Sequence, residues 1–150
     1  MPTASVIYAS LTGNNEEVAE TIVQQLQRLN VAANQLEMSA VTGSDLLKPD
    51  IAVIVPYTYG AGDLPEEGLD LYTDLATLHL PHLIYGVAGS GDVNYGTDFC
   101  RAVTTFNQRL RSTQAICGAE PVMIDYRLDD TDKQNLAKFS RQLIPTYGGS

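Results

Sequence analysis

The stretch Ile51-Ala52-Val53-Ile54-Val55 decides the fold, because every one of its residues is apolar. A strand with one face in water alternates apolar and polar residues, whereas a central strand of a parallel sheet is buried on both faces and is apolar throughout. Residues 51–55 are therefore expected to form a central strand of a parallel sheet.

Strand and helix patterns alternate along the rest of the chain. Apolar, β-branched runs predict buried strands over residues 4–9 and 83–88, and weaker patterns predict strands over 31–37 and 121–125. Apolar residues at helical spacing predict longer helices, and Asp45-Leu46-Leu47 predicts a short helical turn. The longer helices are expected to start near Glu16, Pro65, Phe99 and Asp129.

This alternation indicates an α/β fold with right-handed crossovers. We expect one domain over residues 1–150, a three-layer, doubly wound sandwich whose five-stranded parallel sheet has the order 2-1-3-4-5. Ligands of such folds bind at the carboxyl ends of the strands, beside the switch point between strands 1 and 3. Three loops should therefore face a ligand: residues 10–15, 56–64 and 88–98.

Composition narrows the function classes. The 150-residue chain carries a net charge of −9, which disfavours binding to nucleic acid or to an anionic membrane. No apolar run approaches the roughly 18 residues of a membrane span, and Met1–Ala4 lacks the start of a secretory signal, so we expect a cytoplasmic protein. Cys100 and Cys117 are too few for a disulfide scaffold and are expected to be buried or half-buried thiols.

Acidic residues gather in the middle of the chain. No Lys or Arg occurs between Lys48 and Arg101, so this window should give one region of the molecule a strong negative field. Its acidic residues are Asp50, Asp63, Glu66, Glu67, Asp70, Asp74, Asp92 and Asp98.

The loop after the first strand has the composition of an anion site. Ser10-Leu11-Thr12-Gly13-Asn14-Asn15-Glu16 offers hydroxyls, amides and free backbone N–H groups at a helix start, enough for one phosphate. An ordinary capped turn is the alternative, since Ser, Thr and Asn are common N-caps. The loop has neither the P-loop nor the dinucleotide glycine pattern and no C-x5-R, and the third strand ends without the Asp of a receiver domain.

The loops after the third and fourth strands carry aromatic residues among glycines. Tyr57 and Tyr59 lie beside Gly60 and Gly62, and Tyr95 follows a Gly-rich segment that begins at Gly89. Exposed rings of this kind could clamp a flat ligand, or they could simply pack on one another. The meeting of three such loops at the switch point favours a planar, phosphorylated ligand.

These three segments resemble the flavin-binding loops of the flavodoxin family, in order and correctly spaced. The first is residues 10–16, the second is Tyr57-Thr58-Tyr59-Gly60-Ala61-Gly62-Asp63-Leu64-Pro65, and the third is residues 89–95 followed by Phe99-Cys100-Arg101-Ala102-Val103. The resemblance covers essentially the whole chain. No long insertion splits the last strand, so the chain resembles the short-chain class of flavodoxins.

The resemblance implies a low-potential one-electron carrier with non-covalently bound FMN that shuttles electrons between a reductase and acceptor enzymes. It implies phosphate contacts in the first loop, Tyr59 on the inner face of the ring, Tyr95 on the outer face and a backbone group of Gly60 at flavin N5. The loop from Gly89 to Asp92 would bind the pyrimidine edge. The full implied set is Ser10, Leu11, Thr12, Gly13, Asn14, Asn15, Tyr57, Thr58, Tyr59, Gly60, Gly89, Ser90, Gly91, Asp92, Tyr95, Phe99 and Cys100.

Some positions depart from the family pattern. Leu11 and Ala61 stand where polar and acidic residues are frequent, and Tyr95 and Phe99 are one residue further apart than usual. These departures affect side-chain contacts, a charge beside the ring and the placement of the outer ring. The partners implied are redox proteins with basic surfaces, namely a reductase and acceptor enzymes, and the chain is expected to be a monomer.

Two rival functions stay open. A flavin enzyme of the same fold, such as a quinone reductase, would need a second substrate pocket, which no motif marks. A regulatory module without cofactor would not bind FMN at all. His79 and His82 have an H-x-x-H spacing, but without an evident third ligand they are expected to be loop residues and not a metal site.

Overall fold

The computed structural model of the chain describes residues 2–9, 14–56, 69–91, 101–125 and 129–144. The helices of this part are α1 (Asn14–Arg28), α2 (Leu69–Leu75), α3 (Arg101–Ser112) and α4 (Asp130–Gln142). Its strands are β1 (Thr3–Tyr8), β2 (Ala32–Glu37), β3 (Ile51–Val55), β4 (Ile84–Gly91), β5 (Ile116–Cys117) and β6 (Val122–Asp125). Two 3-10 turns, η1 (Met38–Ala40) and η2 (Gly43–Leu47), join β2 to β3.

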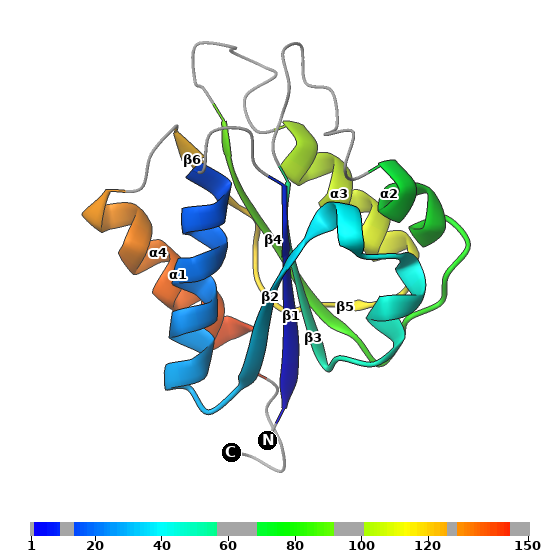
Figure 1. The fold of residues 1–150 in the computed structure, drawn as a ribbon, viewed down its shortest axis with the longest axis horizontal. Coiled ribbons are helices and arrows are strands. Elements are labelled where there is room, and N and C mark those ends of the chain that lie inside the picture. Colours follow the sequence, from blue (N-terminus) through cyan, green and yellow to red (C-terminus); the bar gives the residue numbers. More distant parts are fainter. Residues whose placement is uncertain (1, 10–13, 57–68, 92–100, 126–128, 145–150) are drawn as a thin grey trace.

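The described strands form a parallel sheet in the order β2-β1-β3-β4-β5, and β6 extends it by pairing with β4. Figure 1 shows the sheet between two helical layers, with α1 and α4 on one side and α2 and α3 on the other. The predicted order 2-1-3-4-5 and the three-layer architecture are therefore confirmed. That residues 1–150 form one domain stays a prediction.

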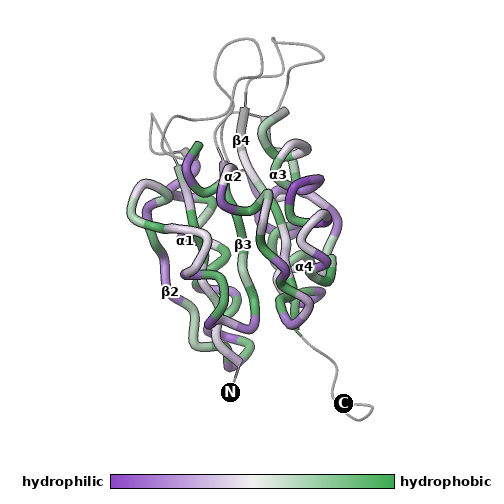
Figure 2. Tube along the Cα trace, turned by 90° about the vertical axis from the view of Figure 1, so that its right-hand side faces the viewer, coloured by the Kyte–Doolittle hydropathy of each residue, from purple (hydrophilic) through white to green (hydrophobic). Residues whose placement is uncertain are grey.

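The position of β3 follows from its apolar residues. All five residues of β3 have no exposed surface, and Figure 2 colours the strand as hydrophobic along its length. Val53 pairs with Val6 of β1 on one side and with Gly86 of β4 on the other, so β3 is central within the described sheet. Neighbouring residues of β3 point to opposite faces, so the strand contributes to the cores on both sides.

Each face of the sheet has its own core. Val18, Ile22 and Leu26 of α1 pack with Leu136 and Phe139 of α4 on one face. The residues that fill the other face come from α2, α3 and η2, and they include Leu46, Leu71, Leu75, Phe106 and Leu110. Burial of large side chains on this scale, at roughly 1.5–3 kcal/mol each, is what holds the layers together.

The sheet has one strand more than predicted. The strand expected over residues 121–125 is confirmed as β6, but β4 is also flanked by the two-residue β5, which was not predicted. Gly118 lies between β5 and β6, and a Cβ there would come within 2.5 Å of Ile84 Cγ2 and 2.9 Å of Leu143 Cδ2. The chain therefore passes very close to β4 at this point, before Pro121 interrupts the hydrogen-bonding ladder.

β4 is also longer than predicted. The glycines at 89 and 91 indicated a loop, yet the strand continues to Gly91. The reason is tertiary, because Ala88 to Gly91 pair in register with Val122 to Asp125 of β6.

The last helix begins where it was predicted, directly after Asp129. Asp129 caps α4 by accepting from the backbone N–H of Asp132 at 2.7 Å, and the Asp132 carboxylate accepts from the N–H of Asp129 at 3.1 Å. Such reciprocal caps stabilise a helix by about 1 kcal/mol. The predicted helical turn at residues 45–47 is confirmed as part of η2. Within the described residues, no helix is long and apolar enough to cross a membrane.

Candidate cofactor site

Three parallel strands end at one edge of the sheet and define the candidate site. The chain leaves its described part after Ala9, Pro56 and Gly91, which follow or end β1, β3 and β4. Because these strands are parallel and adjacent, the three exits lie along the carboxyl edge, where Figure 1 also shows the start of α1. The switch point is therefore where the strand order predicts a ligand.

The two ends of segment 10–13 are held in place by hydrogen bonds. Asn15, in the first turn of α1, has no exposed surface, and its Nδ2 donates to the carbonyl oxygen of Ala9 at 2.9 Å. The N–H of Ala9 in turn donates to the carbonyl of Val55 at the end of β3, at 3.0 Å. The first turn of α1, the end of β1 and the end of β3 are thus joined in one chain of contacts.

The base of the third loop is fixed by close approach. A Cβ on Gly89 would come within 2.5 Å of the Pro56 carbonyl oxygen and 2.9 Å of Val103 Cγ2. Only a residue without a side chain lets β4 lie this close to the end of β3. Gly89 thus sets the separation between the bases of the second and third loops.

The first turn of α1 fits a phosphate. The first backbone N–H groups of a helix have no partner within the helix and carry its positive dipole end. Here the helix start lies beside the ends of β1 and β3, and the Asn15 side chain is turned inward instead of across the helix end. This donor set suits one anionic group held by backbone dipoles.

Carboxylates lie beside this edge. Tyr8, the last residue of β1, pairs in register with Glu37 of β2. Burial raises the pKa of Tyr8, and the negative charges of Glu16 and Glu37 raise it further. The site is thus built beside negative charge, which disfavours further anionic charge on a bound ligand.

Only some of the predicted site residues lie within the described part. Asn14 begins α1, Asn15 anchors it, and Gly89, Ser90 and Gly91 form the end of β4. The structure brings these two groups to the same edge. The predicted residues outside the described part are Ser10, Leu11, Thr12, Gly13, Tyr57, Thr58, Tyr59, Gly60, Asp92, Tyr95, Phe99 and Cys100.

Two described acidic residues of the window 50–98, Asp50 and Asp74, hydrogen bond to the backbone of other elements. Asp50 immediately precedes β3, at the opposite edge of the sheet from the site, where its carboxylate accepts from the N–H of Thr3 at 2.9 Å. Asp74 on α2 accepts from the N–H of Gly43 at 3.0 Å. The negative field expected of this window stays a prediction, because Asp63, Glu66, Glu67, Asp92 and Asp98 lie outside the described residues.

Cys117 also differs from expectation, since it is exposed and not buried. β5 is only two residues long and lies at the end of the sheet order, so little covers its side chains. The thiol donates to the carbonyl of Ala119 at 3.3 Å.

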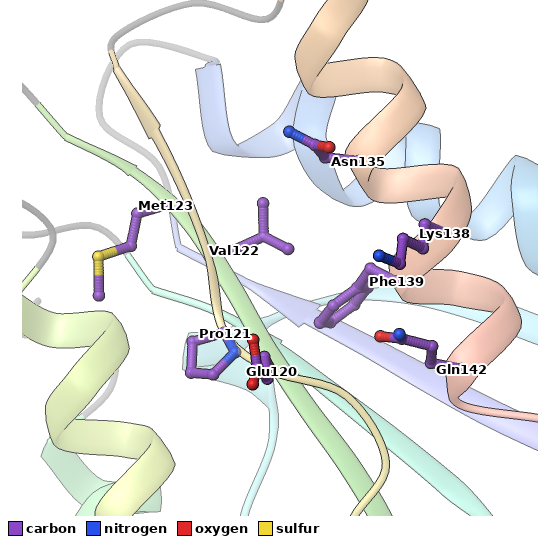
Figure 3. Close-up of a pocket in the computed structure, with 8 residues that line it drawn as sticks. All are labelled: Glu120, Pro121, Val122, Met123, Asn135, Lys138, Phe139 and Gln142. Carbon is purple, nitrogen blue, oxygen red and sulfur yellow. The ribbon is translucent and has the colours of Figure 1, made fainter.

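A pocket elsewhere is separate from the site. A cavity of about 300 Å³ lies between β6 and α4, and no predicted cofactor residue lines it. Figure 3 shows Val122 and Phe139 among its lining residues. His79 and His82 are both exposed. Among the described residues, no group of three His, Cys, Asp or Glu side chains could hold a metal ion.

Comparison with known proteins places the chain in a family. The family model for flavodoxins matches residues 6–139. The chain belongs to the flavodoxin family. Flavodoxins are electron carriers, and FMN is their cofactor.

Individual relatives agree with this assignment. The chain is 33% identical over 145 residues to "Probable flavodoxin 1" of Bacillus subtilis, a match that covers 96% of this chain and 91% of that protein. A solved structure of a short-chain flavodoxin associated with a bacterial microcompartment is 45% identical with a TM-score of 0.93, over 95% of this chain and 97% of that one. The sulfite reductase [NADPH] flavoprotein alpha-component of Vibrio cholerae is 34% identical over 114 residues, 74% of this chain but 18% of that protein.

The close approach at Gly89 generates a test. Gly89→Ala should force the Pro56 backbone away and displace the segment that follows β3. We expect FMN and riboflavin affinities to fall together, by about tenfold or more, and the free energy of unfolding to fall by about 1–3 kcal/mol. Calorimetric titration and urea unfolding measure the two effects.

Gly118→Ala is the matched control, because its Cβ would also come within 2.5 Å of a neighbouring atom but lies between β5 and β6. It should destabilise the fold and leave flavin affinity unchanged. Equal losses of flavin affinity in the two variants would show that Gly89 matters only for stability.

Proposed function

We propose that this flavodoxin shuttles single electrons at low potential between a reductase and acceptor enzymes. When bound, FMN supplies the redox chemistry, and the protein sets the potential and the access of partners. The observation that carries the proposal is that the carboxyl ends of β1, β3 and β4 lie together and are held by hydrogen bonds and close contacts. There a helix start provides anion-binding N–H groups, and the bases of all three flavin loops are fixed relative to one another.

The cofactor contacts are proposed from the motifs. Residues 10–15 would hold the phosphate through hydroxyl, amide and backbone N–H groups. Tyr59 and Tyr95 would cover the two faces of the ring, with Tyr57, Thr58, Phe99 and Cys100 beside them. Residues 89–92 would bind the pyrimidine edge. The absence of Lys and Arg from residues 10–16 suits a phosphate that stays bound and is not transferred.

Gly60 is proposed to present its peptide group to N5 of the ring. A glycine lets this peptide turn at little cost, whereas a side chain would add strain of about 1 kcal/mol. Gly60→Ala should therefore lower the first of the two one-electron reduction potentials by roughly 40 mV, the equivalent of that strain for one electron. Spectroelectrochemical titration measures the shift.

Ala61→Gly is the control for this experiment, because it changes the next residue without adding a side chain. Its potentials should match those of the wild type. A first potential that is unchanged in Gly60→Ala would rule out the proposed contact at N5.

Absorption and fluorescence of the protein with added FMN test the proposed function itself. We expect a yellow complex with quenched flavin fluorescence, and no oxidation of NADPH by the purified complex alone. NADPH oxidation without a second protein would favour a flavin enzyme, the reading to which the sulfite reductase relative points. A protein that leaves flavin fluorescence unquenched would instead be a module without cofactor.

Docking partners are proposed to be redox proteins with basic surfaces. The chain has a net charge of −9, and such charge steers association over distances set by ionic strength. Raising the ionic strength from about 0.01 M to 0.15 M shortens the screening length from roughly 30 Å to 8 Å. The rate of electron transfer to a basic cytochrome should then fall by about tenfold or more, as stopped-flow absorbance would show.

An acidic redox protein is the matched control, and its rate should rise or stay constant over the same salt series. A rate to the basic cytochrome that does not depend on salt would contradict charge-steered docking. The monomeric state and the cytoplasmic location belong to the same proposal. Sedimentation of the holoprotein and fractionation of the cells that make it would test them.

A further inference from the structure

Asn15 differs from the other buried polar residues of the described part. The three buried polar residues of this part are Asn15, Thr113 and Ser140. Thr113, directly after α3, and Ser140 of α4 donate to carbonyls three and four residues earlier, those of Leu110 and Leu136. Asn15 instead donates across the chain to Ala9, six residues earlier and outside its helix. The Asn15 amide therefore joins two elements, whereas the two hydroxyls hydrogen bond to carbonyls that are close in sequence.

The buried amide fixes the register between α1 and β1. A buried amide without a hydrogen bond costs several kcal/mol on transfer scales, so the contact with the Ala9 carbonyl is strongly favoured once the side chain is enclosed. Ala9 is itself fixed by its N–H, which donates to Val55 of β3. The first turn of α1 is therefore attached to the central strand through Asn15 and Ala9.

This attachment sets the direction of the phosphate-binding donors. An anion at a helix start is held by several N–H groups at once, so a small rotation of the first turn misdirects all of them. Holding the turn in place before the ligand arrives reduces the entropy that is lost on binding. An aspartate at this position could not donate to Ala9 and would add negative charge at the anion site, and an apolar residue would leave the Ala9 carbonyl without this donor.

We propose that Asn15 is a positioning residue whose buried side-chain amide locks the start of α1 onto the end of β1 and thereby gives the protein its preference for a phosphorylated flavin over the same ring without phosphate. The inference rests on the proposed FMN function and deepens it. The side chain acts through the Ala9 carbonyl, so its effect should appear in phosphate-dependent affinity and not in ring binding as such.

Paired titrations of the apoprotein with FMN and with riboflavin test this inference. Asn15→Leu keeps the branched arrangement of four side-chain heavy atoms but cannot donate. We expect its dissociation constant for FMN to rise about tenfold, the order expected for one lost hydrogen bond, while that for riboflavin stays within about twofold. The preference for FMN over riboflavin should thus fall by about tenfold.

Ser140→Ala is the matched control, because it removes another buried hydrogen bond, on α4, where none of the predicted cofactor residues lies. It should leave both dissociation constants unchanged. An Asn15→Leu variant that weakens FMN and riboflavin equally, or neither, would overturn the positioning role. If the wild type bound neither flavin, the proposed function itself would fail, so the two failures are distinct.

Exchange of the Asn15 side-chain amide protons in the unmodified apoprotein provides a second measurement, which does not depend on the folding of a variant. Protection of these protons before any flavin is added is expected, because the contact positions the helix in advance. Free exchange that slows only when FMN binds would show that the ligand orders the turn, and it would overturn the inference.

Discussion

Burial of β3 on both faces is the constraint on which the rest of the structure depends. A strand without any exposed surface requires helices above and below it and a paired strand on each side, and the sheet and both helical layers supply these. The parallel neighbours β1 and β4 must then end at the same edge as β3. The position of the site therefore follows from the packing, since its loops leave the sheet at the ends of these three strands.

The same core also fixes the positions of the loops that form the site. Ala9 hydrogen bonds to Val55, and Gly89 lies against the Pro56 carbonyl, so the bases of the loops are set by strands in the centre of the protein. Asn15 adds the helix to this group. Loop residues that bind a ligand then need not hold the loops in place, because the elements that carry them are held by the core.

The elements with strong local patterns were predictable from sequence, and those that depend on partners were not. Residues 51–55 could be assigned without error because five consecutive apolar residues are typical of a central parallel strand. β5 was missed because two residues give no periodicity, and Gly89–Gly91 indicated a loop because the pairing with β6 that extends β4 is tertiary. The loop motifs located the edge of the site. The inward direction of the Asn15 side chain could not be predicted, since an asparagine at a helix start is more often a cap and its contact with Ala9 joins two elements.

The division of the sheet edge into β5 and β6 has a consequence for how copies of the protein meet. An unpaired strand edge is a template for a strand from another molecule, and long, flat edges promote aggregation. Here the edge beside β4 consists of two- and four-residue strands with Pro121 between them, so an incoming strand finds no continuous row of donors and acceptors. At the opposite edge, Gln27 Nε2 of α1 donates to the Ala33 carbonyl of β2 at 3.4 Å and occupies a position that a foreign strand could use. Neither edge of the described sheet therefore offers a long, free strand for pairing with another molecule, although Ile116 and Met123 expose apolar surface along one edge.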